Sequence, residues 1–228
     1  MQLIPNIVSK TRSVLYNTHW MTLPWSKIPK TPLDKLVDIV AKMTGLLEDL
    51  EHLVDSHTGS TVHLYLRNGC HELLAELESW FNDTAPKLDI DRLLNIGKRK
   101  SSTTDLAKAH TLALFWSICL LLRPTILAIL PDMQSSPRFD LHGLRYNILR
   151  LLPIFFKPDA GWYGVNIALF PARSIYDTLD EYPLSPQEAR LMASLNAEYK
   201  RKEISGFLHS MAHYRSNFAQ KRTADRPI

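Results

Sequence analysis

The feature that most constrains this chain is an apolar stretch, LALFWSICLLLRPTILAIL, which runs from Leu112 to Leu130. So many consecutive apolar residues must be shielded from water, either inside a protein core or inside a bilayer. The stretch is short for a bilayer span, which needs about 20 apolar residues, and Arg123-Pro124 interrupts it. We therefore predict a buried central helix, broken or kinked at Pro124, and we expect no membrane contact.

The remaining composition predicts an all-α protein with a single domain. The 228 residues lie within the range of one domain, and 45% of them are hydrophobic while 22% are charged, as in ordinary globular proteins. The low count of 8 Gly and the aliphatic runs at helical spacing argue against strands and tight turns. We predict about seven helices around the central one, with an irregular lead-in at residues 1–30 that packs by its aromatic residues and a frayed tail at residues 220–228.

Capping and breaking signals indicate where the first helices begin and end. Thr31-Pro32 can cap and start a helix, and the apolar residues that follow keep helical spacing as far as Leu50. A second helix is predicted over Val62–Phe81, with Pro86 ending it. A polar connection over Leu88–Thr103 then leads into the central helix.

The second half of the chain carries further start signals. Thr104-Asp105 is the expected opening of the central helix, and Ser185-Pro186-Gln187-Glu188 has the pattern of a capping box with proline in the first turn. Pro171 is expected to bend its helix. The helices predicted beyond the central one cover Leu141–Phe156, Val165–Leu179, Ser185–Tyr199 and Ile204–Phe218.

Charge and cysteine content bound the partners and the compartment. The net charge is +4, but the basic residues are scattered, and the two tightest runs, Lys98-Arg99-Lys100 and Lys200-Arg201-Lys202, are short. A nucleic-acid surface has a denser basic stripe, so we expect no direct nucleic-acid binding. Cys70 and Cys119 lie far apart in apolar helical segments, which indicates buried, reduced thiols and an intracellular location.

The sequence contains few patterns that are typical of catalysis. It has no glycine-rich phosphate loop and no nucleophile elbow. Glu48, Glu51 and Asp55 share one helix face and could hold magnesium, as in a helical prenyl-type enzyme, but no second acidic cluster faces them, and a solvated face is favoured. His209 and His213 are one turn apart, a spacing that can bind zinc, yet a third ligand is missing. We therefore expect no metal site and no cofactor.

Three stretches, taken in order, resemble the regulatory region of fungal zinc binuclear cluster transcription factors. The first is HWMTLPWSKIPKTPLDKLVDIVAKMTGLLEDL at His19–Leu50, the second is the central ALFWSICLLL, and the third is LLPIFFKPDAGWYGVNIALFPARSIYDTL at Leu151–Leu179. The resemblance implies an all-helical regulatory domain that acts in the nucleus through protein partners, as a homodimer or with a full-length paralogue, or through a small apolar effector. It implies no catalytic residue.

The chain departs from that family in its cysteines. The DNA-binding element of the family needs six cysteines in a short basic segment to hold two zinc ions, whereas this sequence has 2 cysteines in all. The resemblance therefore implies a regulator without its own DNA-binding element, or a fragment of a longer regulator.

A second hypothesis belongs to another class of function. A stand-alone protein of this fold could bind, or even convert, an apolar metabolite in a fungal biosynthetic pathway, because function resides in sites and not in folds. Apolar ligand pockets are rich in aromatic side chains with a few polar groups, although aromatic residues are also the largest core fillers. The candidate pocket residues on this hypothesis are Trp20, Trp25, His110, Trp116, Asp159 and Tyr163.

Overall fold

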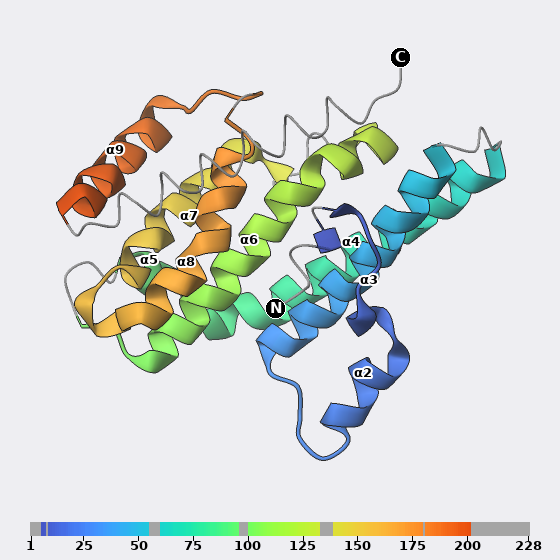
Figure 1. The fold of residues 1–228 in the computed structure, drawn as a ribbon, viewed down its shortest axis with the longest axis horizontal. Coiled ribbons are helices and arrows are strands. Elements are labelled where there is room, and N and C mark those ends of the chain that lie inside the picture. Colours follow the sequence, from blue (N-terminus) through green and yellow to red (C-terminus); the bar gives the residue numbers. More distant parts are fainter. Residues whose placement is uncertain are drawn as a thin grey trace.

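The computed structural model describes residues 6–7, 9–54, 60–95, 100–132, 139–179 and 181–201, which are helical with no strand (Figure 1). This confirms the predicted all-α fold around a central apolar helix. The predicted helix Ile204–Phe218 and the tail 220–228 lie outside the described residues. The α-helices are α2 (Thr18–Thr22), α3 (Pro32–Val54), α4 (Ser60–Leu88), α5 (Ile90–Leu94), α6 (Thr103–Ile129), α7 (Leu141–Phe155), α8 (Gly161–Tyr176) and α9 (Pro186–Arg201), and the short 3-10 helices are η1 (Val14–Tyr16), η2 (Leu23–Trp25) and η5 (Pro158–Ala160).

The central helix α6 is the core around which the others pack. It buries 15 residues and contacts α3 and α4 on one side and α7 and α8 on the other (Figure 1). From α4, the rings of Trp80 and Phe81 stack on Phe115 of α6 at centroid distances of 5.2 and 4.9 Å. By length and composition α6 could cross a membrane, but 61% of its most apolar window is buried inside the protein, as in the core helix of a soluble domain.

The two residues that interrupt the apolar stretch are both accommodated within α6. The helix continues through Pro124, which is exposed, so it is not broken there. Arg123 donates from Nε to the carbonyl oxygen of Phe139 at 2.9 Å, and its guanidinium lies over the ring of Tyr182 at 5.3 Å from the centroid. The charged side chain thus reaches past the apolar surface to a polar partner.

Capping explains where α6 begins. The N-cap is Ser102, whose hydroxyl accepts from the Asp105 amide at 3.0 Å while the Asp105 carboxylate accepts from Ser102, so the helix begins at Thr103 and not at the predicted Thr104. Burial alone would raise the pKa of Asp105, but the bonds from Ser102 and the charge of Arg92 outweigh it and hold that pKa below its usual value.

The connection between α4 and α6 differs from the prediction. Helix α4 continues through Pro86 to Leu88, so the expectation that Pro86 ends the helix is wrong by two residues. Leu88 is buried, and packing against the core favours this last turn. The segment predicted as a polar connection includes α5, which buries Leu93 against the same core.

A close contact between α7 and α8 requires a glycine. A Cβ added at Gly164 would lie 2.1 Å from the carbonyl oxygen of Phe155 and 2.6 Å from the Cβ of Ala160. Three residues earlier, Gly161 has a φ of +54°, a conformation that favours glycine. A Cβ added at Gly161 would meet no atom within 4 Å. Both glycines belong to the stretch PDAGWYG. The positive φ and the close helix contact explain why glycine occupies these two positions.

Helix α9 is attached to α7 through a buried ion pair. The guanidinium of Arg145 is fully buried on α7. It donates from Nε to Glu188 at 2.8 Å, from Nη1 to the carbonyl oxygen of Tyr182 at 2.8 Å and from Nη2 to that of Pro183 at 3.0 Å. Glu188 also accepts from the Ser185 amide, which confirms the predicted capping box. Burial alone would raise the pKa of Glu188, but these hydrogen bonds, together with one to His142, outweigh burial and lower it.

We expect Arg145→Met to lower the free energy of unfolding by about 3 kcal/mol, because it leaves the Glu188 carboxylate buried without its cation. The matched control Arg173→Met removes a half-exposed pair with Asp177 and should cost less than about 1 kcal/mol. Urea denaturation measures both. Since the folded pKa of Glu188 lies below its ordinary value of 4.5, the difference should be full above pH 4.5 and shrink as the pH falls through the folded pKa. Equal, small losses in the two variants would contradict the role of Arg145.

We expect Gly164→Ala to destabilise the protein by about 3 kcal/mol, because the new Cβ would collide with backbone atoms of α7. Gly161→Ala should cost less, about 2 kcal/mol, since it adds backbone strain without a collision. Thermal unfolding of the two variants tests this order, and a larger loss for Gly161→Ala would refute it.

Candidate interaction surface

The candidate pocket residues are distributed over the fold. Trp20 of α2 is 58% exposed, and so is Tyr163 of α8, which lies far from α2 (Figure 1). Trp25 of η2 is half-buried, with the ammonium of Lys30 at 5.9 Å from its ring centroid. Trp20 and Tyr163 therefore belong to separate parts of the protein surface.

The other three candidates lie near α6. Trp116 is buried in the core, and His110 on the same helix is half-buried, where burial lowers the pKa of its imidazole. Asp159 of η5 accepts a hydrogen bond from the Ser101 amide at 2.6 Å, so its carboxylate ties the α7–α8 turn to the entry of α6. None of the six candidate residues lines the apolar cavity that the structure contains.

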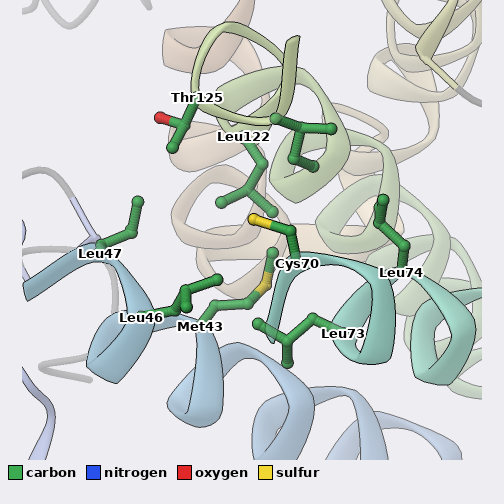
Figure 2. Close-up of a pocket in the computed structure, with 9 residues that line it drawn as sticks. Met43, Leu46, Leu47, Cys70, Leu73, Leu74, Leu122 and Thr125 are labelled. Carbon is green, nitrogen blue, oxygen red and sulfur yellow. The ribbon is translucent and has the colours of Figure 1, made fainter. Parts of the chain in front are cut away.

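That cavity lies between α3, α4 and α6, with the sulfur of Cys70 directed toward Leu122 (Figure 2). Its volume is about 20 Å³, which is room for about one water molecule. Burial raises the pKa of the Cys70 thiol to about 11, so the thiol stays protonated at neutral pH and is a poor nucleophile. The lining residues are Met43, Leu46, Leu47, Cys70, Leu73, Leu74, Leu122, Thr125 and Ile126.

The acidic face of α3 is occupied by the N-terminal segment. Glu48 and Asp49 both pair with Arg12, at 2.9 and 2.7 Å, and Glu51 pairs with Lys10 at 2.5 Å. Asp55, the third member of the predicted magnesium set, lies outside the described residues. Within the residues described, no group of three His, Cys, Asp or Glu side chains is placed to hold a metal ion. The predicted pair His209 and His213 also lies outside them.

Residues 9–31, here called the N-terminal arm, contact α3 through η1 and through ion pairs near both ends of the arm. Lys30 pairs with Asp38 of α3, in addition to the pairs of Lys10 and Arg12. The Ser13 amide donates to the Thr44 hydroxyl at 2.9 Å in a buried bond, which holds the arm close to α3. Polar and ionic bonds therefore supply much of the attachment between the arm and α3.

Several large apolar side chains of the arm are exposed, whereas Leu15 and Met21 pack against the core. Trp20, Leu23 and Ile28 are 58–64% exposed, and Val14 is as exposed as Leu23. Of the eight strongly exposed large hydrophobic side chains among the described residues, five belong to the arm, the fifth being Tyr16. The expectation that the lead-in packs by its aromatic residues therefore fails at Trp20. The arm therefore divides its apolar side chains, because Leu15 and Met21 face the core while Trp20, Leu23 and Ile28 face solvent.

This arrangement makes the arm the strongest candidate for a functional surface. Contiguous exposed apolar groups are typical of binding surfaces, and aromatic residues are over-represented where binding energy is concentrated. The exposed side chains Trp20, Leu23 and Ile28 are apolar, so association is the chemistry that they support.

A charge asymmetry in the sequence could have identified the arm. Residues 1–33 contain no Asp or Glu, and their Lys10, Arg12, Lys27 and Lys30 equal the net charge of +4, which leaves 23 basic and 23 acidic residues in the rest of the chain. An acidic run at Glu48–Glu51 follows in the next helix. A basic segment next to an acidic helix face favours ionic pairing between them.

We expect Arg12→Met to loosen the arm by about 1 kcal/mol, because it removes the pairs with Glu48 and Asp49. The Ser13 amide, bonded to Thr44, should then exchange its hydrogen about fivefold faster. Hydrogen–deuterium exchange measures this. Lys42→Met is the control, because Lys42 lies elsewhere on α3 and forms an exposed pair with Glu76 of α4. Equal exchange at Ser13 in both variants would contradict the role of the ion pairs.

Comparisons with known proteins add no relative to this description. No family model matches the chain, and no curated protein or solved structure is similar to it. The resemblance to fungal zinc-cluster regulators stays a prediction that rests on the residues quoted for it.

Proposed function

We propose that this chain is a transcription-factor-like regulatory domain that lacks its own zinc cluster and acts in the nucleus through protein partners. The observation that carries the proposal is the exposure of large apolar side chains on the N-terminal arm, which presents Trp20, Leu23 and Ile28 to solvent. Such a surface loses free energy when another macromolecule covers it. The three stretches that resemble zinc-cluster regulators supply the cellular context, and the first of them, His19–Leu50, includes part of the arm.

The distribution of polar groups supports binding over catalysis. Acidic side chains that could serve chemistry are paired within the fold, as Glu48, Asp49 and Glu51 are with the arm and Asp105 is with Arg92. The buried pair of Arg145 and Glu188 holds α9 in place. Each of these groups has a structural partner, so a structural role accounts for it.

A second candidate function is the binding of an apolar metabolite, and the cavity between α3, α4 and α6 is the observation that favours it. Its lining is apolar apart from Thr125 and the Cys70 thiol, as a site for a hydrocarbon group requires. The volume of about 20 Å³ is far below the few hundred Å³ that a metabolite needs, so binding would require the three helices to separate. The first proposal demands no such rearrangement.

The regulatory proposal predicts an effect on transcription when the chain is brought to a promoter. We expect a fusion of this chain to an unrelated DNA-binding domain to change reporter expression severalfold, because the tethered chain recruits its partners. The double variant Trp20→Glu/Leu23→Glu should remove the effect, since it places charges on the exposed arm. Tyr163→Glu is the matched control, because Tyr163 has the same exposed fraction as Trp20 and lies on α8.

Immunoblotting checks that the fusions accumulate to equal levels. Reporter expression that is the same with and without the chain would count against a regulatory role. An effect that survives in the double variant would place the regulatory surface elsewhere on the protein.

A further inference from the structure

The sequence that leads into α6 places hydroxyl side chains directly after a basic run. Lys98-Arg99-Lys100 is followed by Ser101-Ser102-Thr103-Thr104 and then by Asp105. Protein kinases select their substrates partly by charge, and a kinase with an acidic substrate groove pairs with cations a few residues before the acceptor hydroxyl. The charge pattern of this segment is therefore that of a substrate for a basic-directed serine kinase.

The structure distinguishes between the two serines that follow the basic run. Ser101 is 6% exposed, and its hydroxyl oxygen is buried without a hydrogen-bond partner among the described residues. Ser102 is exposed, and its backbone is extended, with φ −77° and ψ 162°. An enzyme that enters from solvent can reach the hydroxyl of Ser102 but not that of Ser101.

The hydroxyl of Ser102 also has a structural task, because Ser102 is the N-cap of α6. Its oxygen accepts from the Asp105 amide at 3.0 Å, and it donates its proton to the Asp105 carboxylate at 2.8 Å. That carboxylate is buried and also accepts from Arg92 of α5 at 2.9 Å. A change at one exposed oxygen thus acts on a buried carboxylate.

A phosphoryl group on Ser102 would meet opposing forces. The positive end of α6 and the guanidinium of Arg92 favour an anion. The first turn of α6 already holds the Asp105 carboxylate, however, and a phosphate would be a second anion beside it. The new group also removes the proton that Asp105 accepts, while Arg92 is 58% exposed and is screened by solvent. Repulsion therefore outweighs attraction, and the cap of α6 opens.

The cap region joins α6 to two other elements. Arg92 connects α5 to Asp105, and the Ser101 amide donates to Asp159 of η5 at 2.6 Å. Both contacts lie at the end of the helical bundle where α6 begins (Figure 1). Opening of the cap would loosen α5 and η5 from α6 without removing the apolar packing farther along the central helix.

We propose that Ser102 is a phosphorylation site whose modification opens the N-terminal cap of α6. A protein kinase transfers the γ-phosphoryl group of ATP to the Ser102 oxygen: the new Oγ–P bond forms, the bond from the γ-phosphorus to the bridging oxygen breaks, ADP leaves, and the hydroxyl proton passes to a base of the kinase. This device controls the core of the fold and goes beyond the proposed function, because it does not involve the N-terminal arm.

The first test locates the phosphate. The purified full chain is incubated with magnesium, ATP and cAMP-dependent protein kinase, which is basic-directed, and is then mapped by tandem mass spectrometry. We expect phosphate on Ser102 and none on Ser101, and the same result for chain isolated from its source cells. Ser102→Asn is the matched control, because asparagine caps a helix as well as serine but has no hydroxyl to modify.

The second test measures the consequence. Kinase treatment should lower the melting temperature of the wild-type chain by about 5 °C, because it removes the bond to a buried carboxylate and adds repulsion. The Ser101 amide, bonded to Asp159, should exchange its hydrogen about tenfold faster. Ser102→Asn should show neither change after the same treatment, so that phosphate elsewhere on the chain is accounted for.

Asp105→Asn separates the proposed mechanism from a general effect of added charge. This variant has no carboxylate beside Ser102, so kinase treatment should lower its melting temperature by less than half as much as in the wild type. Ser102 without phosphate in the kinase-treated chain or in the cellular chain would overturn the inference. An unchanged or higher melting temperature after phosphorylation would overturn it as well, and so would an equal fall in wild type and Asp105→Asn.

Discussion

The structure depends on the burial of α6, a helix that is apolar on nearly all sides. A helix with one apolar stripe needs a single neighbour, but α6 must be surrounded, and α3, α4, α7 and α8 do so. This requirement shapes the fold: α3 and α4, which precede α6 in the chain, cover one side, and α7 and α8, which follow it, cover the other. Helix α9 and the arm lie at the periphery of this core, and ion pairs add to the apolar contacts that they make with it.

These two peripheral elements are attached in contrasting ways. Helix α9 is held by a fully buried pair, Arg145 with Glu188, in which the loss of either partner leaves a charge without compensation. The arm is held by pairs such as Arg12 with Glu48, which are partly exposed and which water and salt weaken. The first attachment is suited to permanent structure, and the second to a surface whose position is adjustable.

Much of the fold could be predicted from the sequence, because the signals that decide it are local. The apolar run predicted the central helix, and Thr31 and Ser185 predicted helix starts that their hydrogen bonds to Asp34 and Glu188 confirm. Pro86 was misleading because packing of Leu88 outweighed a local breaking signal. The candidate pocket residues were chosen by chemical type alone, and no local pattern reports which of them share a surface. The exposed side chains of the arm were missed for a related reason, since Trp20, Leu23 and Ile28 face outward and the usual assumption places such residues inside.

The single side chain of Arg145 has a mechanical consequence. Its guanidinium donates hydrogen bonds to two carbonyl oxygens of the connection before α9 and to a carboxylate within α9, so one side chain holds both the connection and the helix. A force that pulls α9 outward therefore loads this guanidinium first, and when it yields, the connection and α9 come away as one unit. Because α9 packs mainly on α7, that release would leave α6 covered by its four neighbours. The connection and α9 thus form one mechanical unit, fixed to α7 by a single buried side chain.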